Sequence, residues 1–352
     1  MQKVETTFGP VRIGQEALDG LNDWLKHAEP TLSRVFVLVD ENTHEHCLPT
    51  FCAALPSLPP VEILEIPSGE ESKSLEMVTS LLEALQEHRA DRNSLLLSLG
   101  GGVVTDLGGL VASLYMRGIR HVVVPTSLLG MVDASIGGKT GVNLAGIKNS
   151  IGTFSPAEGV YCYPPFLDTL PEKEVLSGLA EMLKHALLMG ESALSSWEAL
   201  SSTGNEEFAL ALVESVQCKA RFVNRDPSDH LGIRAALNMG HTVGHALESV
   251  LLSTGLTHGE AVAAGLWIES LLAEQVAGLP SSTGKRIRSS IDQLYKRLPR
   301  VDFDLLWKKM HRDKKNQSEQ VTFVLLHALG QDPILYPVGR SLVLDAVEKY
   351  GT

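Results

Sequence analysis

Short apolar runs alternate with amphipathic stretches through the first half of the chain. Each run stops at turn residues, as in "RVFVLVDEN" (34–42), "VEILEIP" (61–67), "SLLLSLG" (94–100) and "HVVVP" (121–125). A stretch of helical period, such as residues 74–88, lies between successive runs. This rhythm predicts a parallel sheet with helices on both faces. We therefore expect an α/β, Rossmann-like domain over residues 1–170.

The second half of the chain shows a different pattern. Apolar residues recur there at helical spacing over 171–190, 206–225, 234–252 and 258–278. Polar loops such as "SSTGN" (201–205) separate these stretches. We expect residues 171–352 to form a mostly α-helical domain that binds metal and substrate.

Composition narrows the class of protein. The chain has 352 residues, of which 44% are hydrophobic and 20% charged, as in an ordinary globular protein of two domains. A formal net charge of −12 argues against nucleic acid or anionic membrane as a partner. The start of the sequence shows no secretory signal, no apolar run suits a bilayer, and the four cysteines form no C-x-x-C pair. These features favour a cytoplasmic protein.

A glycine-rich turn follows one of the predicted strands. In "SLGGGVVTDLGG" (98–109) three consecutive glycines precede a helix, which lets the backbone approach a ligand and offers free N–H groups to a phosphate. Asp106 lies one turn into that helix. Asp40 and Asn42 end an earlier strand, where ribose hydroxyls bind in dinucleotide folds, although both are also common turn residues. Together these strand ends favour dinucleotide binding.

Candidate phosphate and metal ligands lie further along the chain. Residues 132–152 read as a long glycine-rich loop with Lys139, Lys148 and Asn149, which suits phosphate contacts. "NMGHTVGHALE" (238–248) holds two histidines four residues apart, but threonine stands where a metalloprotease has its glutamate. The residues alone leave the choice of ligands open among the following: Glu181, His185, His241, His245 and His258.

Seven segments of the chain, taken in their order along the sequence, resemble the 3-dehydroquinate synthase family of the shikimate pathway. The resemblance runs through "PSGEESKS" (67–74), "GGGVVTDLGG" (100–109), "VPTSLLGMVDASIGGKTGVN" (124–143), "SGLAEMLKHA" (177–186), "NMGHTVGHALE" (238–248), "THGEAVAAG" (257–265) and "RDKKN" (312–316).

The resemblance implies a site, residue by residue. Zinc or cobalt would be held by Glu181, His241 and His258, His245 would be a proton relay, and His185 would be structural. NAD contacts would fall on Asp40, Asn42, Glu70, Lys73, Gly101, Gly102, Val103, Asp106, Thr126, Ser127, Leu129, Asp133, Lys139, Lys148, Thr169, Leu170 and Glu174. Substrate contacts would fall on Arg117, Lys139, Asn149, Lys184, Lys219, Arg234, Asn238, His245 and one or both of Lys314 and Lys315.

The resemblance also implies a reaction and an assembly. The family converts 3-deoxy-D-arabino-heptulosonate 7-phosphate to 3-dehydroquinate and phosphate, using NAD catalytically through oxidation, β-elimination, reduction, ring opening and aldol closure. Arg117 would reach into the site of a partner subunit, which implies a homodimer. The alternatives are another sugar-phosphate cyclase, of the 2-deoxy-scyllo-inosose or 2-epi-5-epi-valiolone type, and a metal-dependent polyol dehydrogenase. A non-enzymatic NAD-binding module fits less well, since it needs neither metal ligands nor a proton relay.

Overall fold

The computed structural model describes residues 1–251, 254–311 and 320–351 and separates into two compact units. The first unit comprises Met1–Pro171 and Ser202–Ser228, and the second comprises Glu172–Ser201 and Asp229–Thr352. Residues 202–228, expected in the helical domain, thus group with the sheet. Whether the division at residue 170 separates two true domains stays a prediction.

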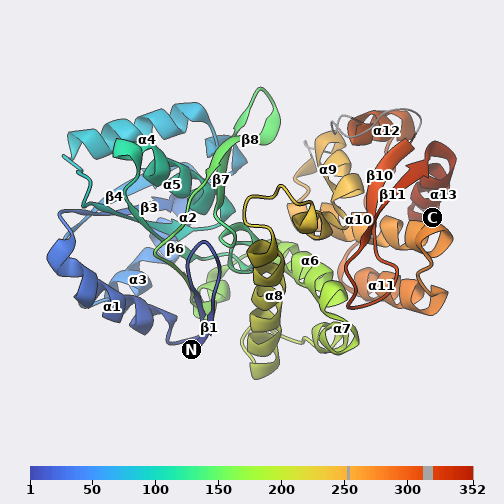
Figure 1. Ribbon diagram of the computed structural model, residues 1–352, viewed down its shortest axis with the longest axis horizontal. Coiled ribbons are helices and arrows are strands. Elements are labelled where there is room, and N and C mark those ends of the chain that lie inside the picture. The colour runs from blue at the N-terminus through green and yellow to red at the C-terminus, as the bar shows by residue number, and fades with distance from the viewer. Residues whose placement is uncertain (252–253, 312–319, 352) are drawn as a thin grey trace. The chain divides into compact units, whose positions relative to one another are not determined.

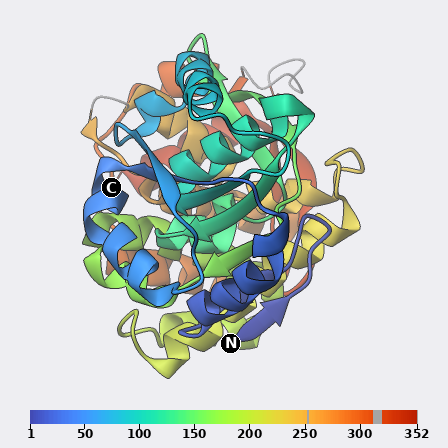
Figure 2. The same cartoon turned by 90° about the vertical axis from the view of Figure 1, so that its left-hand side faces the viewer.

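A seven-stranded sheet forms the core of the first unit (Figures 1 and 2). Its strand order is β1-β2-β9-β6-β5-β3-β4, and all neighbours are parallel except the β1–β2 pair. The strands are β1 (Gln2–Val4), β2 (Val11–Ile13), β3 (Val35–Asp40), β4 (Val61–Ile66), β5 (Leu95–Gly100), β6 (Arg120–Pro125) and β9 (Gly159–Cys162). The predicted parallel sheet is therefore confirmed.

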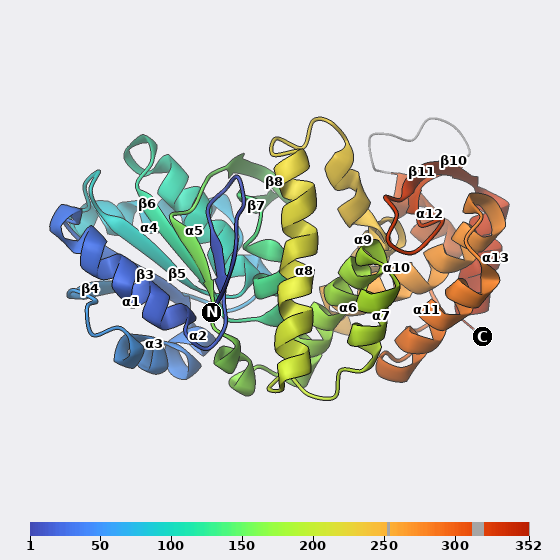
Figure 3. The ribbon, with the colours of Figure 1, turned by 60° about the horizontal axis from the view of Figure 1, so that its bottom comes forward.

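Helices cover both faces of this sheet. Side chains of α4 and α5 pack with Phe36, Leu38 and Leu96 on one face, and α1 and α3 lie on the other (Figure 1). The central strands β3 and β5 are apolar almost throughout because both of their faces are buried, whereas the edge strands β1 and β4 carry exposed charged residues. The helices of this unit are α1 (Ala17–Ala28), α2 (Glu41–His46), α3 (Leu48–Ala54), α4 (Leu75–Glu87), α5 (Gly102–Leu114) and α8 (Glu206–Arg225). Figure 3 shows α8 as one uninterrupted helix.

The long loop expected over residues 132–152 is not what forms. A π-helical turn, η4 (Gly130–Ala134), is followed by an antiparallel hairpin of β7 (Lys139–Leu144) and β8 (Ile147–Phe154). The interpretation failed because glycines weaken the strand pattern. A Cβ on Gly152 would lie 1.9 Å from the carbonyl oxygen of Thr140, so only glycine lets these strands approach.

In its described residues, the second unit is a helical bundle with a small hairpin of β10 (Gln320–Leu325) and β11 (Ile334–Gly339). Helix α10 is buried on nearly every side because α6, α9, α11 and α13 all pack against it. The helices of this unit are α6 (Glu172–Met189), α7 (Glu191–Glu198), α9 (His241–Val250), α10 (His258–Leu272), α11 (Ser281–Leu294), α12 (Phe303–His311) and α13 (Arg340–Tyr350). Across the described ranges of both units, no helix is long and apolar enough to cross a membrane.

The helix expected over residues 234–252 is interrupted. A short 3-10 turn, η6 (Ile233–Asn238), precedes α9, which begins only at His241. Gly240 breaks the helix because its φ of 80° is left-handed. As a result, one of the candidate ligand residues opens a new helix.

Candidate metal and cofactor site

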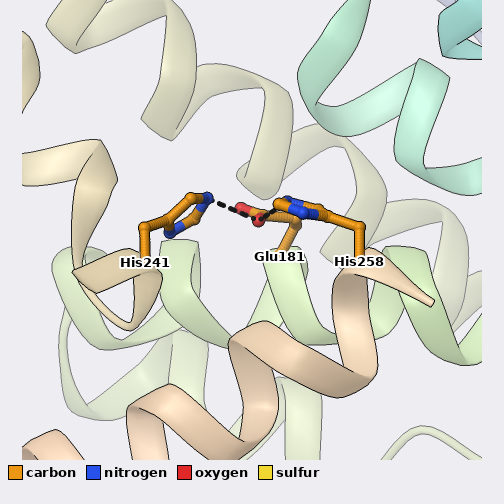
Figure 4. Close-up of side chains that lie close together, drawn as sticks. All are labelled: Glu181, His241 and His258. Atoms are coloured by element: carbon orange, nitrogen blue, oxygen red, sulfur yellow. Dashed lines mark ion pairs between the residues drawn. The ribbon is translucent and has the colours of Figure 1, made fainter. Parts of the chain in front are cut away.

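Three side chains from three helices of the second unit meet at one point (Figure 4). Glu181 lies within α6, His241 is the first residue of α9, and His258 is the first residue of α10. The Nε2 atoms of His241 and His258 each lie 3.3 Å from Oε1 of Glu181. The glutamate is fully buried. These are the three ligands that the family resemblance implied.

The spacing of these donor atoms fits a metal ion. Two ligands about 2.0–2.1 Å from a tetrahedral zinc lie roughly 3.3 Å apart, which matches both imidazole–carboxylate distances. Two nitrogens and one carboxylate oxygen suit zinc or cobalt. Three protein ligands leave one tetrahedral position for water or substrate, which is typical of a catalytic rather than a structural metal site.

Two groups outside this cluster orient its histidines. The Nδ1 atom of His258 lies 3.4 Å from Oε2 of Glu248, and Nδ1 of His241 lies 3.1 Å from the carbonyl oxygen of Met239. Contacts of this kind hold the ring so that Nε2 faces the metal. Sequence reasoning missed Glu248, although its place three residues after His245 on the same helix is a usable signal.

Close backbone packing brings two of the helices together. A Cβ on Gly259 would lie 2.2 Å from the carbonyl oxygen of Ser177, so only glycine lets the first turn of α10 meet α6. The Gly259 N–H also donates to the Ser177 hydroxyl at 3.0 Å. His258 is thereby held against the helix that carries Glu181.

The charges in the cluster are strongly coupled. Burial alone would raise the pKa of Glu181, but the Lys184 ammonium and the imidazole of His241 lower it well below its usual range. Lys184 forms an ion pair with Oε2 of Glu181. Burial alone would lower the pKa of His258, but the carboxylates of Glu181 and Glu248 outweigh it and raise that pKa to about 10.

The other candidates of this unit lie nearby without joining the cluster. The exposed ring of His245 lies 5.1 Å from that of His241 and 6.0 Å from that of His258, measured between centroids. His185 is buried on α6. Arg234 is buried in η6, and Asn238 at the end of that turn is exposed. Lys314 and Lys315 lie outside the described residues.

The glycine-rich turn of the first unit offers backbone N–H groups. Helix α5 begins after Gly101, which caps it with no side chain, so its first N–H groups remain available to an anion. A Cβ on Gly101 would lie 3.3 Å from the Ser127 hydroxyl, which leaves little room for any larger residue. The candidates Thr126, Ser127 and Leu129 follow the carboxyl end of β6, beside this turn.

A hydrogen-bonded chain connects four candidates of the first unit. Lys73 is buried and donates to Oδ2 of Asp106 at 2.6 Å and to Oδ1 of Asn149 at 2.5 Å. The Asn149 N–H donates to Asn143, whose side-chain amide donates to Glu70, each at 2.8 Å. Burial raises the pKa of Asp106, and Lys73 opposes that shift. Asn143 was not among the sequence candidates, because nothing in its sequence neighbourhood marks it as a link.

Three further candidates of this unit already have protein partners. Nζ of Lys219 donates to the carbonyl oxygen and to Oδ1 of Asp133, both at 2.6 Å. The carboxylate of Asp40 accepts from the Thr43 N–H at 2.8 Å and caps α2. Asp40 is therefore a turn residue, as its sequence position also allowed. Capping uses one oxygen of its carboxylate, and the second oxygen can still accept from a ligand.

The remaining candidates lie in defined elements. Arg117 is exposed on a 3-10 turn, η3 (Tyr115–Arg117), with a left-handed φ of 67°. Lys139 opens β7, and Lys148 lies in β8; both are exposed. Asn42 and Glu174 lie in the first turns of α2 and α6, and Gly102 and Val103 open α5. Thr169 ends a 3-10 helix, η5 (Pro164–Thr169), and Leu170 follows it.

Structural comparison defines the class of protein. A 2-deoxy-scyllo-inosose synthase crystallised with carbaglucose-6-phosphate, NAD+ and Co2+ superposes with a TM-score of 0.87 at 22% identity, covering 99% of each chain. A 2-epi-5-epi-valiolone synthase from Streptomyces hygroscopicus subsp. jinggangensis 5008, with NAD+ and Zn2+ bound, gives 0.87 at 26% identity, covering 99% of this chain and 98% of that one. The chain thus has the fold of the sugar-phosphate cyclases.

Sequence comparison defines the family. The N-terminal and C-terminal models of 3-dehydroquinate synthase match residues 63–177 and 178–316. The 3-dehydroquinate synthase of Parabacteroides distasonis is 38% identical over 97% of both chains, and that of Bacillus cereus strain B4264 is 37% identical over 91% of this chain and 90% of the relative. The chain belongs to the 3-dehydroquinate synthase family.

The ligand assignment predicts the metal content of single variants. Changing Glu181, His241 or His258 to alanine should abolish stoichiometric zinc, since each removes one of three donors. His245→Ala is the matched control, because it removes a neighbouring imidazole outside the cluster and should keep the zinc. Elemental analysis of the purified variants after dialysis provides the measurement. Full zinc content in His258→Ala would contradict the assignment.

The raised pKa of His258 predicts a pH dependence of zinc affinity. The metal-free protein holds this imidazole protonated at neutral pH, whereas a ligand must be neutral, so binding displaces a proton. The apparent affinity should therefore increase with pH up to about 10, roughly tenfold per unit. Competition with a chromophoric chelator at several pH values measures it. An affinity unchanged between pH 6 and pH 8 would exclude this protonation.

Proposed function

We infer that this chain is a 3-dehydroquinate synthase, a carbon–oxygen lyase of the shikimate pathway. It would convert 3-deoxy-D-arabino-heptulosonate 7-phosphate to 3-dehydroquinate and phosphate with NAD used catalytically. The family match over residues 63–316 is the observation that carries this conclusion. The three-ligand cluster of Glu181, His241 and His258 supports it, because the reaction needs a Lewis acid.

Different residues of the chain would have different roles in the reaction. A zinc or cobalt ion held by the cluster would polarise the hydroxyl that is oxidised, and NAD would accept and return the hydride. His245, exposed and one helical turn beyond His241, would carry the hydroxyl proton to solvent. Lys184 would hold the substrate beside Glu181. The departing phosphate would be bound by Lys139, Asn149, Arg117 and one or both of Lys314 and Lys315.

The cofactor assignment rests on the first unit. The free N–H groups at the start of α5 would bind the pyrophosphate of NAD, and Asp40 would bind a ribose hydroxyl through its second oxygen. The chain of Glu70, Lys73 and Asp106 would fix the turn against which the cofactor lies. The remaining positions matched to NAD, including Asp133, Lys148, Thr169, Leu170 and Glu174, stay proposals.

Catalytic use of NAD predicts two observations in one assay. With substrate, NAD and zinc, phosphate should be released over many turnovers while absorbance at the NADH band stays flat, because the hydride returns within each cycle. A polyol dehydrogenase would instead accumulate one NADH per turnover. The His245→Ala variant, which retains the metal ligands, is the control for background phosphate release.

The substrate can be distinguished from those of other cyclases by its carboxylate. Lys219 and Arg234 would bind this group, each through charge-assisted hydrogen bonds of roughly 1.5–3 kcal/mol. Arg234→Ala should therefore raise KM for the heptulosonate phosphate tenfold or more by these energies and leave zinc and NAD binding intact. Efficient turnover of sedoheptulose 7-phosphate, which lacks the carboxylate, would assign the chain to another cyclase type.

We propose that the enzyme is a cytoplasmic homodimer. All four cysteines are free thiols, which suits a reducing compartment. Arg117 is exposed in a left-handed conformation beside Met116 and Leu114, which are 44% and 47% exposed, so this turn presents a cation and apolar surface together. Such a surface suits insertion into a second copy of the chain.

A shared site predicts complementation between two inactive variants. Arg117→Ala and His245→Ala should each be inactive alone, since every site then lacks one group. A randomly reassorted mixture should regain roughly a quarter of wild-type activity, because half of the dimers would carry one intact site. Mixing two preparations of the same variant is the control. No recovery after confirmed subunit exchange would place Arg117 in its own subunit's site.

A further inference from the structure

Glu269 is a buried carboxylate that no step of the reaction uses. It lies on α10, and its side chain is 2% exposed. Its Oε2 atom accepts the Gly240 N–H at 2.6 Å, and its Oε1 atom faces the Val243 N–H at 3.4 Å. The carboxylate thus lies at the first turn of α9, the turn that carries His241.

Helix α9 has no cap of its own. Gly240 precedes it in a left-handed conformation and contributes no side chain. The first N–H groups of a buried helix need acceptors, because a buried donor without a partner costs free energy. Glu269 meets this need from the neighbouring helix, beside the N–H groups of Gly240, Thr242 and Val243.

The contact between Glu269 and the start of α9 is part of a larger packing interface between α9 and α10. His258, Val262, Gly265 and Glu269 recur at helical spacing and share one face of α10. A Cβ on Gly265 would lie 1.9 Å from the Gly240 carbonyl oxygen, and one on Gly240 would lie 3.0 Å from that of Val262. The same face of α10 therefore carries the proposed ligand His258 and contacts the start of α9, the helix of the other proposed ligand, His241.

We propose that Glu269 is a positioning residue for the metal centre, which sets where His241 lies relative to Glu181 and His258. The carboxylate ties the Gly240 amide to α10, and His241 is the next residue. Without this hydrogen bond the start of α9 could shift. A shift of the His241 Nε2 atom would change its 3.3 Å distance to Oε1 of Glu181, which suits a tetrahedral ion.

This inference rests on the proposed metal site and predicts zinc affinity rather than activity. Glu269→Leu keeps the volume and removes both acceptors, so zinc should bind on the order of 10-fold more weakly or worse, as for other groups that orient ligands. Glu269→Gln keeps one acceptor oxygen and should lie nearer to the wild type. The absorption spectrum of the cobalt form should change in Glu269→Leu and remain close to that of the wild type in Glu269→Gln.

A matched control separates positioning from general loss of stability. Ile287 on α11 is 1% exposed and borders the same small cavity as Glu269, but its aliphatic side chain has no acceptor to offer an N–H of α9. Ile287→Ala should lower Tm and leave zinc affinity unchanged. Should Glu269→Leu fail to fold, Glu269→Asp serves the same test, because it withdraws the carboxylate by one methylene group.

The possible failures are distinguishable. If the wild type binds no zinc, the metal proposal itself is wrong. If the wild type binds zinc and a folded Glu269→Leu or Glu269→Asp binds it equally well, only the role of Glu269 is overturned. If Glu269→Gln loses as much affinity as Glu269→Leu, or if Ile287→Ala weakens zinc as strongly, the effect is one of packing, and the proposal also falls.

Discussion

The second unit depends on one fully buried carboxylate, that of Glu181. A charged group leaves water only if other groups replace its hydration, and removing one partner from a buried pair is strongly destabilising. Here Lys184 lies one turn along the same helix, and His241 and His258 come from two others. Because each histidine opens its helix, this single carboxylate brings α6, α9 and α10 to one point. The proposed metal site is thus formed around a carboxylate buried in the core of this unit.

The first unit also contains a buried charge whose hydration is replaced by protein groups, but this charge is positive. The buried cation of Lys73 is held between the oxygens of Asp106 and Asn149. Asn149 comes from the β7–β8 hairpin and Asp106 from α5, so the cation connects the hairpin to the helix that follows the glycine turn. A structure of buried charges and close glycine contacts tolerates little displacement. This rigidity is what binding groups need if they are to be held ready for a cofactor.

Element types were largely predictable because hydrophobic period is a local property. The stretch 206–225 read as a helix and forms α8 with the same bounds. The helix expected over 234–252 breaks at Gly240, and much of the stretch 132–152, expected as a loop, belongs to the hairpin of β7 and β8. Both predictions are wrong at glycines, Gly240 and Gly152, where the missing side chain lets another segment of backbone approach closely. A glycine looks the same in sequence whether it loosens a loop or fits a crowded contact.

The sequence by itself determined the parallel sheet, the helical second half and the set of residue types available for chemistry, since these follow from periodicity and composition. Resemblance to a family then selected three ligands from five candidates. Only the tertiary structure decided which atoms meet. His241 and His245 are equivalent by helical spacing, yet it is His241 that pairs with Glu181, because α10 packs against both α6 and α9 and brings the start of α9 to the glutamate. Glu248, Asn143 and Glu269 act through contacts between segments far apart in the chain or in different helices, which local patterns do not encode.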